Sequence, residues 1–325
     1  MKDKLIFILY DSRSGSTLLA SLLNRYRGID VTLESAFVSR VMEINNENNL
    51  HDINKLVDYL FQEVQFVELN IDRQELIVKL KCINGEITKK KVILSIIDIY
   101  FKGKREESMY KVIKHPPYNY IKELSLMFPE AKFLQIIRDG RAVFNSKKNS
   151  KSIGGGLMES NPIIAAFDWR LKIRKCIQFD NVTTIRYEDL IRDTESVLSN
   201  YLDSLYLTNY DKEQTKDQKD YFITIGVNQK GLHHNVGKLP EEANINKWTK
   251  QLSEKEISVY NFINKKVLIN NKYKVQEKSI SLLVFFQFVI YFCQLIIEKV
   301  INILRLLGTP SKLFIKLKRR LKLLK

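Results

Sequence analysis

The chain has 325 residues, of which 45% are hydrophobic, so it can bury a large core and is not a disordered protein. Its three cysteines, Cys82, Cys176 and Cys293, lie far apart, so neither a zinc site nor a disulfide framework is indicated and a reducing compartment is expected. The net charge of +16 is uneven, because residues 278–325 carry ten Lys or Arg and one acid, a net of +9.

The first predicted element is a strand at residues 5–9, because LIFIL is a short, continuous apolar run typical of buried parallel strands. The polar turn DSRSGST follows at once, and after it comes a helix with leucines at helical spacing: Leu18, Leu19, Leu22 and Leu23. The apolar run passes directly into the turn and leaves no room for a signal-peptide cleavage region. We therefore expect a cytoplasmic protein.

Residues 52–101 are predicted to be helical, with apolar residues on one face and the stretch IDRQELIVKL typical of a capped helix. The dipeptide at residues 84–85, Asn-Gly, leaves a β-hairpin open as the alternative. Three further strands, each followed by a polar turn and a helical pattern, are predicted at residues 111–114, 132–138 and 181–187. This alternation predicts an α/β fold with a parallel sheet, in which ligands gather at the carboxyl ends of the strands.

The turn after the first strand combines features that suit a phosphate. A turn that enters a helix presents free backbone N–H groups and the positive end of the helix dipole. Gly15 permits close backbone approach, and three residues add hydroxyl groups: Ser14, Ser16 and Thr17. Alignment with the P-loop pattern G-x-x-x-x-G-K-[ST] places Ser16 where the lysine should be, so the charge would come from Arg13. Taken alone, this turn leaves the alternative of an ordinary polar strand-to-helix turn open.

A second stretch, FPEAKFLQIIRDGRAVFNSKKNS, is a predicted strand that ends in Arg138, followed by a helix start that contains Ser146. Together with SRSGSTLLASLLN and IRYEDLIRD, it resembles the sulfotransferases that use 3′-phosphoadenosine 5′-phosphosulfate as the donor. The order, spacing and strand context of these motifs extend over residues 5–250. The resemblance implies a P-loop-like parallel sheet flanked by helices, and no metal cofactor.

The resemblance also implies how the donor is bound. The first motif, residues 13–17, would cradle the 5′-phosphosulfate. Arg138 and Ser146 stand eight residues apart, the spacing at which the family's arginine and serine share the 3′-phosphate. Tyr187 would lie near the adenine. Lys238 matches a phosphate-contacting lysine of the tyrosylprotein branch, with an ordinary loop lysine as the alternative.

The SRSGST turn is closer to the carbohydrate and tyrosylprotein branches than to the cytosolic small-molecule branch, which has a lysine where this chain has Arg13. This implies transfer of the sulfuryl group to a hydroxyl of a saccharide or surface-polymer precursor. Glu34, twenty-one residues after Arg13, matches the carboxylate that serves as the general base in those branches. Lys114 resembles the lysine of the family's Lys-x-Pro segment, which approaches the bridging oxygen. The alternatives are a solvated glutamate and a surface lysine.

Histidine titrates near neutrality, so three further residues are candidates for the base: His115, His233 and His234. With Glu34 available, we expect the histidines to be structural or to face the substrate, and His115 is the first alternative because it follows Lys114. Two other functions are kept as alternatives. One is an ATP-dependent P-loop kinase, against which the missing lysine at Ser16 argues. The other is a catalytically silent, membrane-bound scaffold with the same fold.

The C-terminal region, residues 278–325, is predicted to be an appendage to a catalytic domain of residues 1–277. Residues 279–297 contain no charge and are just long enough to cross a bilayer at about 20 residues per crossing. The following stretch, SKLFIKLKRRLKLLK, places leucines at helical spacing among seven basic residues, which is typical of a helix on an anionic membrane surface. We expect a peripheral or monotopic anchor and no nucleic-acid binding, with a core helix and a solvated tail as the alternative.

Overall fold

The computed structural model describes residues 4–44, 48–104, 109–150, 157–207, 242–275, 285–286, 289–293 and 296. The chain divides into two compact units. The first consists of Met1–Arg138 and Cys176–Glu242, and the second of Asp139–Lys175 and Ala243–Lys325. The boundary that the sequence predicts between residues 277 and 278 stays a prediction, because most of the C-terminal region lies outside the described residues.

The first unit is built on a five-stranded parallel sheet with the strand order β2-β3-β1-β4-β5. Its strands are β1 (Lys4–Tyr10), β2 (Ile29–Val31), β3 (Tyr110–Ile113), β4 (Lys132–Ile137) and β5 (Val182–Arg186). The predicted α/β fold is therefore confirmed, as are the four strands read from the sequence. The three-residue edge strand β2 was not predicted, because so short a run carries no periodicity of its own.

The central strand β1 is apolar throughout because both of its faces are buried. Leu5, Phe7 and Leu9 belong to one hydrophobic cluster. Ile6, Ile8 and Tyr10 belong to the other. Successive side chains of a strand point to opposite faces, so a strand covered by helices on both sides needs a continuous apolar run.

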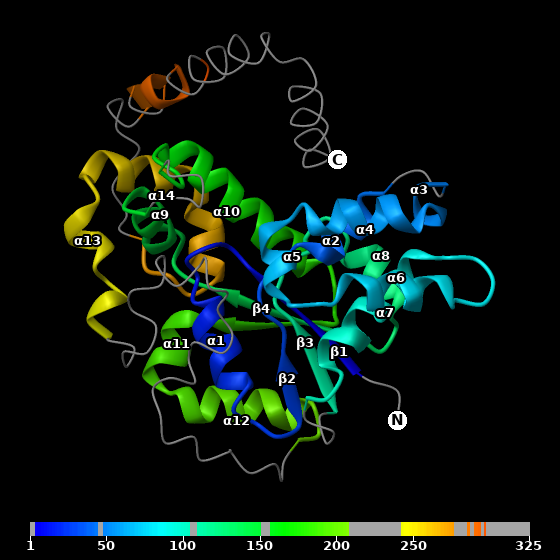
Figure 1. Cartoon of the computed structure of the whole chain (residues 1–325). Helices are drawn as coiled ribbons and strands as arrows, with labels where there is room; N and C mark the ends of the chain where they lie inside the picture. Colours follow the sequence, from blue (N-terminus) through cyan, green and yellow to red (C-terminus); the bar gives the residue numbers. More distant parts are fainter. Residues whose placement is uncertain are drawn as a thin grey trace. The chain divides into compact units, whose positions relative to one another are not determined.

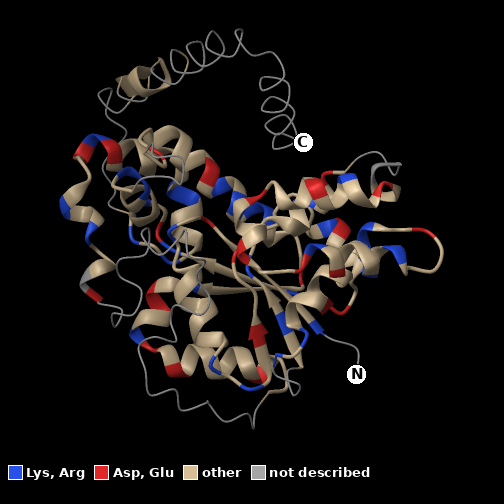
Figure 2. Ribbon diagram, in the orientation of Figure 1, with Lys and Arg blue, Asp and Glu red and all other residues tan. Residues whose placement is uncertain are grey.

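Helices cover the two faces of this sheet (Figure 1). One face packs against α1 (Ser16–Leu23), α11 (Tyr187–Arg192) and α12 (Thr194–Ser204). The other packs against α2 (Phe37–Met42), α3 (Asn48–His51), α4 (Ile53–Phe61), α5 (Val64–Glu68), α6 (Arg73–Lys81), α7 (Lys89–Phe101) and α8 (Ile121–Met127). Figure 2 shows that the charged residues of this unit lie mostly on the helices and loops.

The predicted helical region at residues 52–101 forms the four helices α4 to α7. The side chains of Asp52, Asp72 and Thr88 cap the first turns of α4, α6 and α7, each by accepting a backbone N–H three residues later. Gly85 lies in the turn between α6 and α7 with φ of 76°. The Asn-Gly dipeptide therefore connects two helices, and the hairpin alternative is wrong.

The described part of the second unit is helical. It contains α9 (Gly140–Lys148), α13 (Trp248–Gln251), α14 (Glu254–Asn270), the 3-10 turn η3 (Glu242–Asn244) at its boundary, and most of α10 (Pro162–Ile177). Gly140 begins α9 where a Cβ atom would lie 2.1 Å from the Tyr260 hydroxyl and 2.7 Å from the Trp169 ring. Only glycine fits this contact, which lets α9 pack closely against α14.

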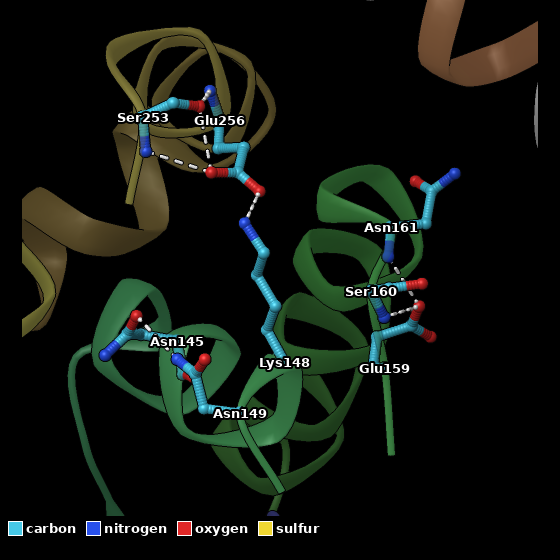
Figure 3. A network of polar contacts seen from close by, with 8 residues as sticks. All are labelled: Asn145, Lys148, Asn149, Glu159, Ser160, Asn161, Ser253 and Glu256. Atoms are coloured by element: carbon cyan, nitrogen blue, oxygen red, sulfur yellow. Dashed lines mark hydrogen bonds and ion pairs between the residues drawn. The ribbon is translucent and has the colours of Figure 1, made fainter. Parts of the chain in front are cut away.

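A polar network ties α9 to the start of α14 in the second unit (Figure 3). Lys148 Nζ donates to Glu256 Oε1 at 2.6 Å. The other oxygen of Glu256 accepts from the backbone N–H of Ser253 at 2.9 Å and from its hydroxyl at 2.8 Å. This capping box fixes the first turn of α14 and orients the carboxylate toward Lys148.

The predicted membrane-associating region is described only at residues 285–286, 289–293 and 296, which are helical. Several of their apolar side chains are exposed, among them Phe285 at 55%, Phe286 at 56% and Ile290 at 57%. Among the described residues, no helix is both long and apolar enough to cross a bilayer. The basic stretch at residues 311–325 lies outside the described residues.

Candidate functional site

The phosphate-binding turn predicted from the sequence lies between β1 and α1, at the carboxyl end of the central strand. The backbone N–H and the hydroxyl of Ser14 both donate to the Asp11 carbonyl, at 3.1 and 2.7 Å. Arg13 and Gly15 have positive φ angles of 74° and 94°. The two left-handed residues turn the chain sharply enough for α1 to begin at Ser16, so its free N–H groups face the loop.

Gly15 is required at its position for a second reason, which is the ring of Tyr187. A Cβ atom on residue 15 would lie 2.4 Å from Cδ2 and 2.7 Å from Cε2 of that ring. Tyr187 is the first residue of α11, directly after β5. Tyr187, which is predicted to lie near the adenine, is thus in contact with the predicted phosphate-binding turn. It lies 172 positions after Gly15 in the sequence.

Arg138 joins the same group from the end of β4. Its guanidinium donates to the Arg13 carbonyl at 3.2 Å, and its Cζ lies 4.5 Å from the centroid of the Tyr187 ring. Burial lowers the pKa of Arg13, and the charge of Arg138 lowers it further. Two guanidinium groups repel each other in a partly buried setting, so an anion bound between them would be strongly favoured.

Lys114 follows directly after β3 and is completely buried, with 0% exposure. Its Nζ donates to Thr17 Oγ1 at 3.2 Å and lies 3.5 Å from Glu34 Oε2. Burial lowers the pKa of Lys114, while the Glu34 carboxylate opposes this shift. The alternative of an ordinary surface lysine is therefore wrong, and Lys114 connects the phosphate-binding turn to the candidate base.

Glu34 lies three residues after the end of β2, and its side chain is 28% exposed. The Tyr10 hydroxyl at the end of β1 also faces this carboxylate, and burial followed by the Glu34 charge raises the pKa of Tyr10. The Glu34 side chain is thus partly open to solvent on one side and flanked by an ammonium group and a phenol. A carboxylate in this setting can accept a proton, and an adjacent cation can stabilise developing negative charge.

The sequence analysis did not single out Tyr10 as a site residue. The only signal was its position, as the last residue of a buried strand before the turn. Tyr10 and Glu34 belong to segments 24 positions apart that the fold brings together, and a local sequence window does not contain that contact.

His115 follows Lys114 and contacts α2. Its Nε2 lies 2.9 Å from the Ser39 hydroxyl on α2. Burial lowers the pKa of His115 to about 4. An imidazole with so low a pKa is neutral at physiological pH, and the Nε2 of this one is already in contact with the Ser39 hydroxyl.

These features place an anion-binding turn, paired arginines, a buried lysine and a carboxylate at the carboxyl ends of parallel strands. The sequence model of the sulfotransferase family matches residues 6–211, which include all of them. The chain belongs to the sulfotransferase family. The protein is therefore a sulfotransferase. The match does not support the kinase alternative.

Solved sulfotransferase structures are similar to this sulfotransferase in fold. The sulfotransferase domain of the Synechococcus PCC 7002 olefin synthase is 21% identical with a TM-score of 0.55, over 85% of this chain and 98% of that one. The sulfotransferase domain from the curacin biosynthetic pathway is 18% identical with a TM-score of 0.49, over 84% and 99%. A sulfotransferase from Mycobacterium avium is 11% identical with a TM-score of 0.45, over 85% and 79%. The first of these supports the shared fold. No protein of curated function matches the sequence.

Two further predicted site residues are Ser146 and Lys238, and two further candidates for the base are His233 and His234. Ser146 lies on α9, in the second unit, and is partly buried. Lys238, His233 and His234 lie outside the described residues. Within the described ranges, no group of His, Cys, Asp and Glu side chains has the arrangement of a metal site.

Proposed function

We propose that this sulfotransferase transfers a sulfuryl group from 3′-phosphoadenosine 5′-phosphosulfate to a hydroxyl of a saccharide or surface-polymer precursor. The observation that carries the proposal is the contact of two cation groups with one turn. Arg138 bonds to the carbonyl of Arg13, and Lys114 bonds to the hydroxyl of Thr17. A donor with phosphates at both ends of a ribose needs cations on both sides of the turn that binds it.

The residues present fit such a donor. Residues 13–17 offer backbone N–H groups and the hydroxyls of Ser14, Ser16 and Thr17, and Arg13 adds a positive charge. Tyr187 offers an aromatic ring beside Arg138, as an adenine site would. Arg138 is proposed for the 3′-phosphate, and Ser146 and Lys238 stay candidates for phosphate contacts on the sequence resemblance alone. When bound, the donor supplies the activated sulfuryl group.

Glu34 acts in this proposal as the general base that removes the proton from the acceptor hydroxyl. Its partial exposure leaves the carboxylate accessible to an acceptor, and the Lys114 ammonium group lies 3.5 Å from it. Lys114 is the cation that meets the negative charge on the leaving oxygen. Because transfer to a hydroxyl is in line, these residues need only position and stabilise, and no covalent intermediate on the enzyme is required.

The carbohydrate class of acceptor is supported by the SRSGST turn and by the position of Glu34, twenty-one residues after Arg13. Both features resemble the carbohydrate and tyrosylprotein branches. Turnover should therefore appear first with mono- and disaccharides and not with small-molecule phenols or steroids. A preference for phenols would reassign the acceptor class without affecting the donor.

Calorimetric titration with adenosine 3′,5′-bisphosphate tests the donor. Saturable binding is expected, and magnesium-dependent ATP binding that is tighter than bisphosphate binding would contradict the proposal. Glu34→Gln should retain this binding while turnover falls by about two orders of magnitude, the usual contribution of a positioned base. Exposed Glu254, changed to Gln, is the matched control and should keep full turnover. If the protein binds the donor but transfers sulfate to no acceptor of a broad panel, the alternative of a catalytically silent scaffold would be favoured.

We further propose that the C-terminal region holds the enzyme on an anionic membrane surface from the cytoplasmic side. The exposed aromatic side chains of Phe285 and Phe286, followed by the basic stretch at 311–325, support it. Each Lys or Arg near such a surface contributes on the order of 1 kcal/mol, and buried apolar side chains make the binding resistant to salt. The intact protein should pellet with vesicles containing phosphatidylserine, and truncation before Ser279 should leave it in the supernatant. Equal recovery of both forms in the supernatant would contradict the proposal.

A further inference from the structure

The segment that carries Glu34 has no regular structure of its own. Glu34 lies between the three-residue strand β2 and the six-residue helix α2. A general base must be held within a fraction of an ångström of its productive position, because a misplacement of about 1 Å can cost on the order of a hundredfold in rate. Contacts from elsewhere in the fold must therefore hold this segment in place.

On its C-terminal side, the segment is held by the Glu63 carboxylate. Glu63 Oε1 accepts the backbone N–H of Ala36 at 2.6 Å, and Oε2 accepts the hydroxyl of Ser35 at 3.2 Å. The Ser35 hydroxyl in turn accepts the N–H of Phe37, the first residue of α2, at 3.3 Å. Glu63 itself lies between α4 and α5 and is only 8% exposed. A buried carboxylate is costly unless it is hydrogen-bonded, and these bonds satisfy both oxygens.

On its N-terminal side, the segment is held by Tyr100 and by β3. The Tyr100 hydroxyl on α7 accepts the backbone N–H of Leu33 at 3.0 Å. Thr32 donates its N–H to the Val112 carbonyl at 2.8 Å, and its hydroxyl accepts the backbone N–H of Lys114 at 3.0 Å. The last bond ties the segment to the residue whose ammonium group lies beside the Glu34 carboxylate.

We propose that Glu63 and Tyr100 are positioning residues that hold the Glu34 carboxylate beside Lys114. They clamp the residues on either side of Glu34, from two different helical segments that lie 27 and 67 positions away. This inference rests on the proposed role of Glu34 as the base. The hydrogen bonds of Glu63 go to Ser35 and Ala36 and that of Tyr100 goes to Leu33, so both residues hold the chain neighbours of Glu34.

Three variants separate the bonds from other effects. Glu63→Ala removes both acceptors, whereas Glu63→Gln removes the charge but retains one oxygen for the Ala36 N–H. Tyr100→Phe removes only the oxygen that accepts from Leu33, with no change in charge. Asp98→Asn, on the same helix as Tyr100, breaks an exposed ion pair with Lys79 and is the matched control.

The first measurement is amide hydrogen exchange of the peptide that spans residues 33–37, in the protein without donor or acceptor. Exchange should accelerate at least about tenfold in Glu63→Ala and in Tyr100→Phe, less in Glu63→Gln, and not at all in Asp98→Asn. Unchanged exchange in both Glu63→Ala and Tyr100→Phe would overturn the inference, whatever the acceptor is.

The second measurement is a double-mutant cycle with Glu34→Gln, using radiolabelled donor and the most active saccharide of an acceptor panel. Glu63→Ala should lower kcat about tenfold or more with the KM for the donor unchanged, and Glu63→Gln should restore much of this loss. In the Glu34→Gln background, Glu63→Ala should add almost nothing, because the base that it positions is gone.

The outcomes distinguish two failures. Additive losses from Glu63→Ala and Glu34→Gln would show a general effect on folding and overturn the positioning role while leaving the proposed function intact. Full turnover in Glu34→Gln would instead show that Glu34 is not the base, and both the proposed mechanism and this inference would fail together.

Discussion

The guanidinium carbon of Arg138 lies 4.5 Å from the centroid of the Tyr187 ring, and the same ring leaves no room for a side chain at Gly15. Three separate motifs of the sequence thus meet in one contact. Arg138 directly follows β4, Tyr187 begins α11, and Gly15 closes the turn after β1. A change at any of them should affect the others, and the first two predictions test this coupling.

Gly15→Ala should destabilise the protein and abolish binding of adenosine 3′,5′-bisphosphate. Its φ of 94° is unfavourable for alanine by about 1 to 2 kcal/mol, and the added Cβ would collide with the Tyr187 ring at 2.4 Å. Gly85→Ala is the matched control, because Gly85 has φ of 76° and no atom within 4 Å of the added Cβ. Urea unfolding should show a larger decrease in the free energy of unfolding for Gly15→Ala than for Gly85→Ala. If both variants lost the same free energy of unfolding and Gly15→Ala still bound the bisphosphate, the packing of Tyr187 against the turn would be contradicted.

Arg138→Lys and Tyr187→Leu should weaken donor binding in different ways. Lysine keeps the charge but not the planar guanidinium that bonds and stacks, so Arg138→Lys should lower the bisphosphate affinity about tenfold or more. The same substitution should lower the affinity for adenosine 5′-phosphate much less, because that ligand lacks the 3′-phosphate. Tyr187→Leu should weaken the binding of both ligands about equally, since it removes the ring proposed to lie beside the adenine. Calorimetry with the two nucleotides measures both affinities. If Arg138→Lys lowers the affinity for both nucleotides equally, Arg138 does not bind the 3′-phosphate.

Lys114 should make the protein more stable as the pH rises above neutrality. Burial lowers the pKa of Lys114, so the folded protein releases this proton at a lower pH than the unfolded chain does. Between the two pKa values the unfolded chain binds more protons, and the free energy of unfolding therefore increases with pH. Urea unfolding between pH 7 and 10 should show this increase in the wild type and in Lys79→Met, an exposed control, but a smaller increase in Lys114→Met. The same slope in all three proteins would contradict the burial of a charged Lys114.

His115 should make the protein less stable as the pH falls. Burial lowers the pKa of His115 to about 4, below its usual 6.5, so acidification protonates the unfolded chain first. Stability is therefore lost progressively between about pH 6.5 and pH 4, by roughly 1 to 3 kcal/mol. His115→Gln should lose less stability over this range, whereas His51→Gln, at an exposed histidine, should behave as the wild type. Equal acid sensitivity of His115→Gln and the wild type would show that His115 is not buried in a neutral form.

The sequence by itself determined the features that depend on neighbouring residues. LIFIL predicts the buried strand β1, and the Ser and Gly residues of the following turn predict a sharp entry into α1. Asp72 and Thr88 lie at the caps of α6 and α7 because a capping side chain bonds to a backbone N–H only three residues away. The motifs that resemble sulfotransferases also lie within short windows, so the family was recognisable before any contact was known.

Only the tertiary structure decided which side chains share one site. The buried ammonium group of Lys114 bonds to Thr17, 97 positions away, and Gly15 is in contact with the Tyr187 ring. The Glu34 segment is held by Tyr100, on α7, and by Glu63, between α4 and α5. The amphipathic pattern of these helices does not indicate the bonds that the two residues make. Such contacts form when helices pack on a sheet, and their free energy comes from burial and hydrogen bonding between elements, which no window of adjacent residues contains.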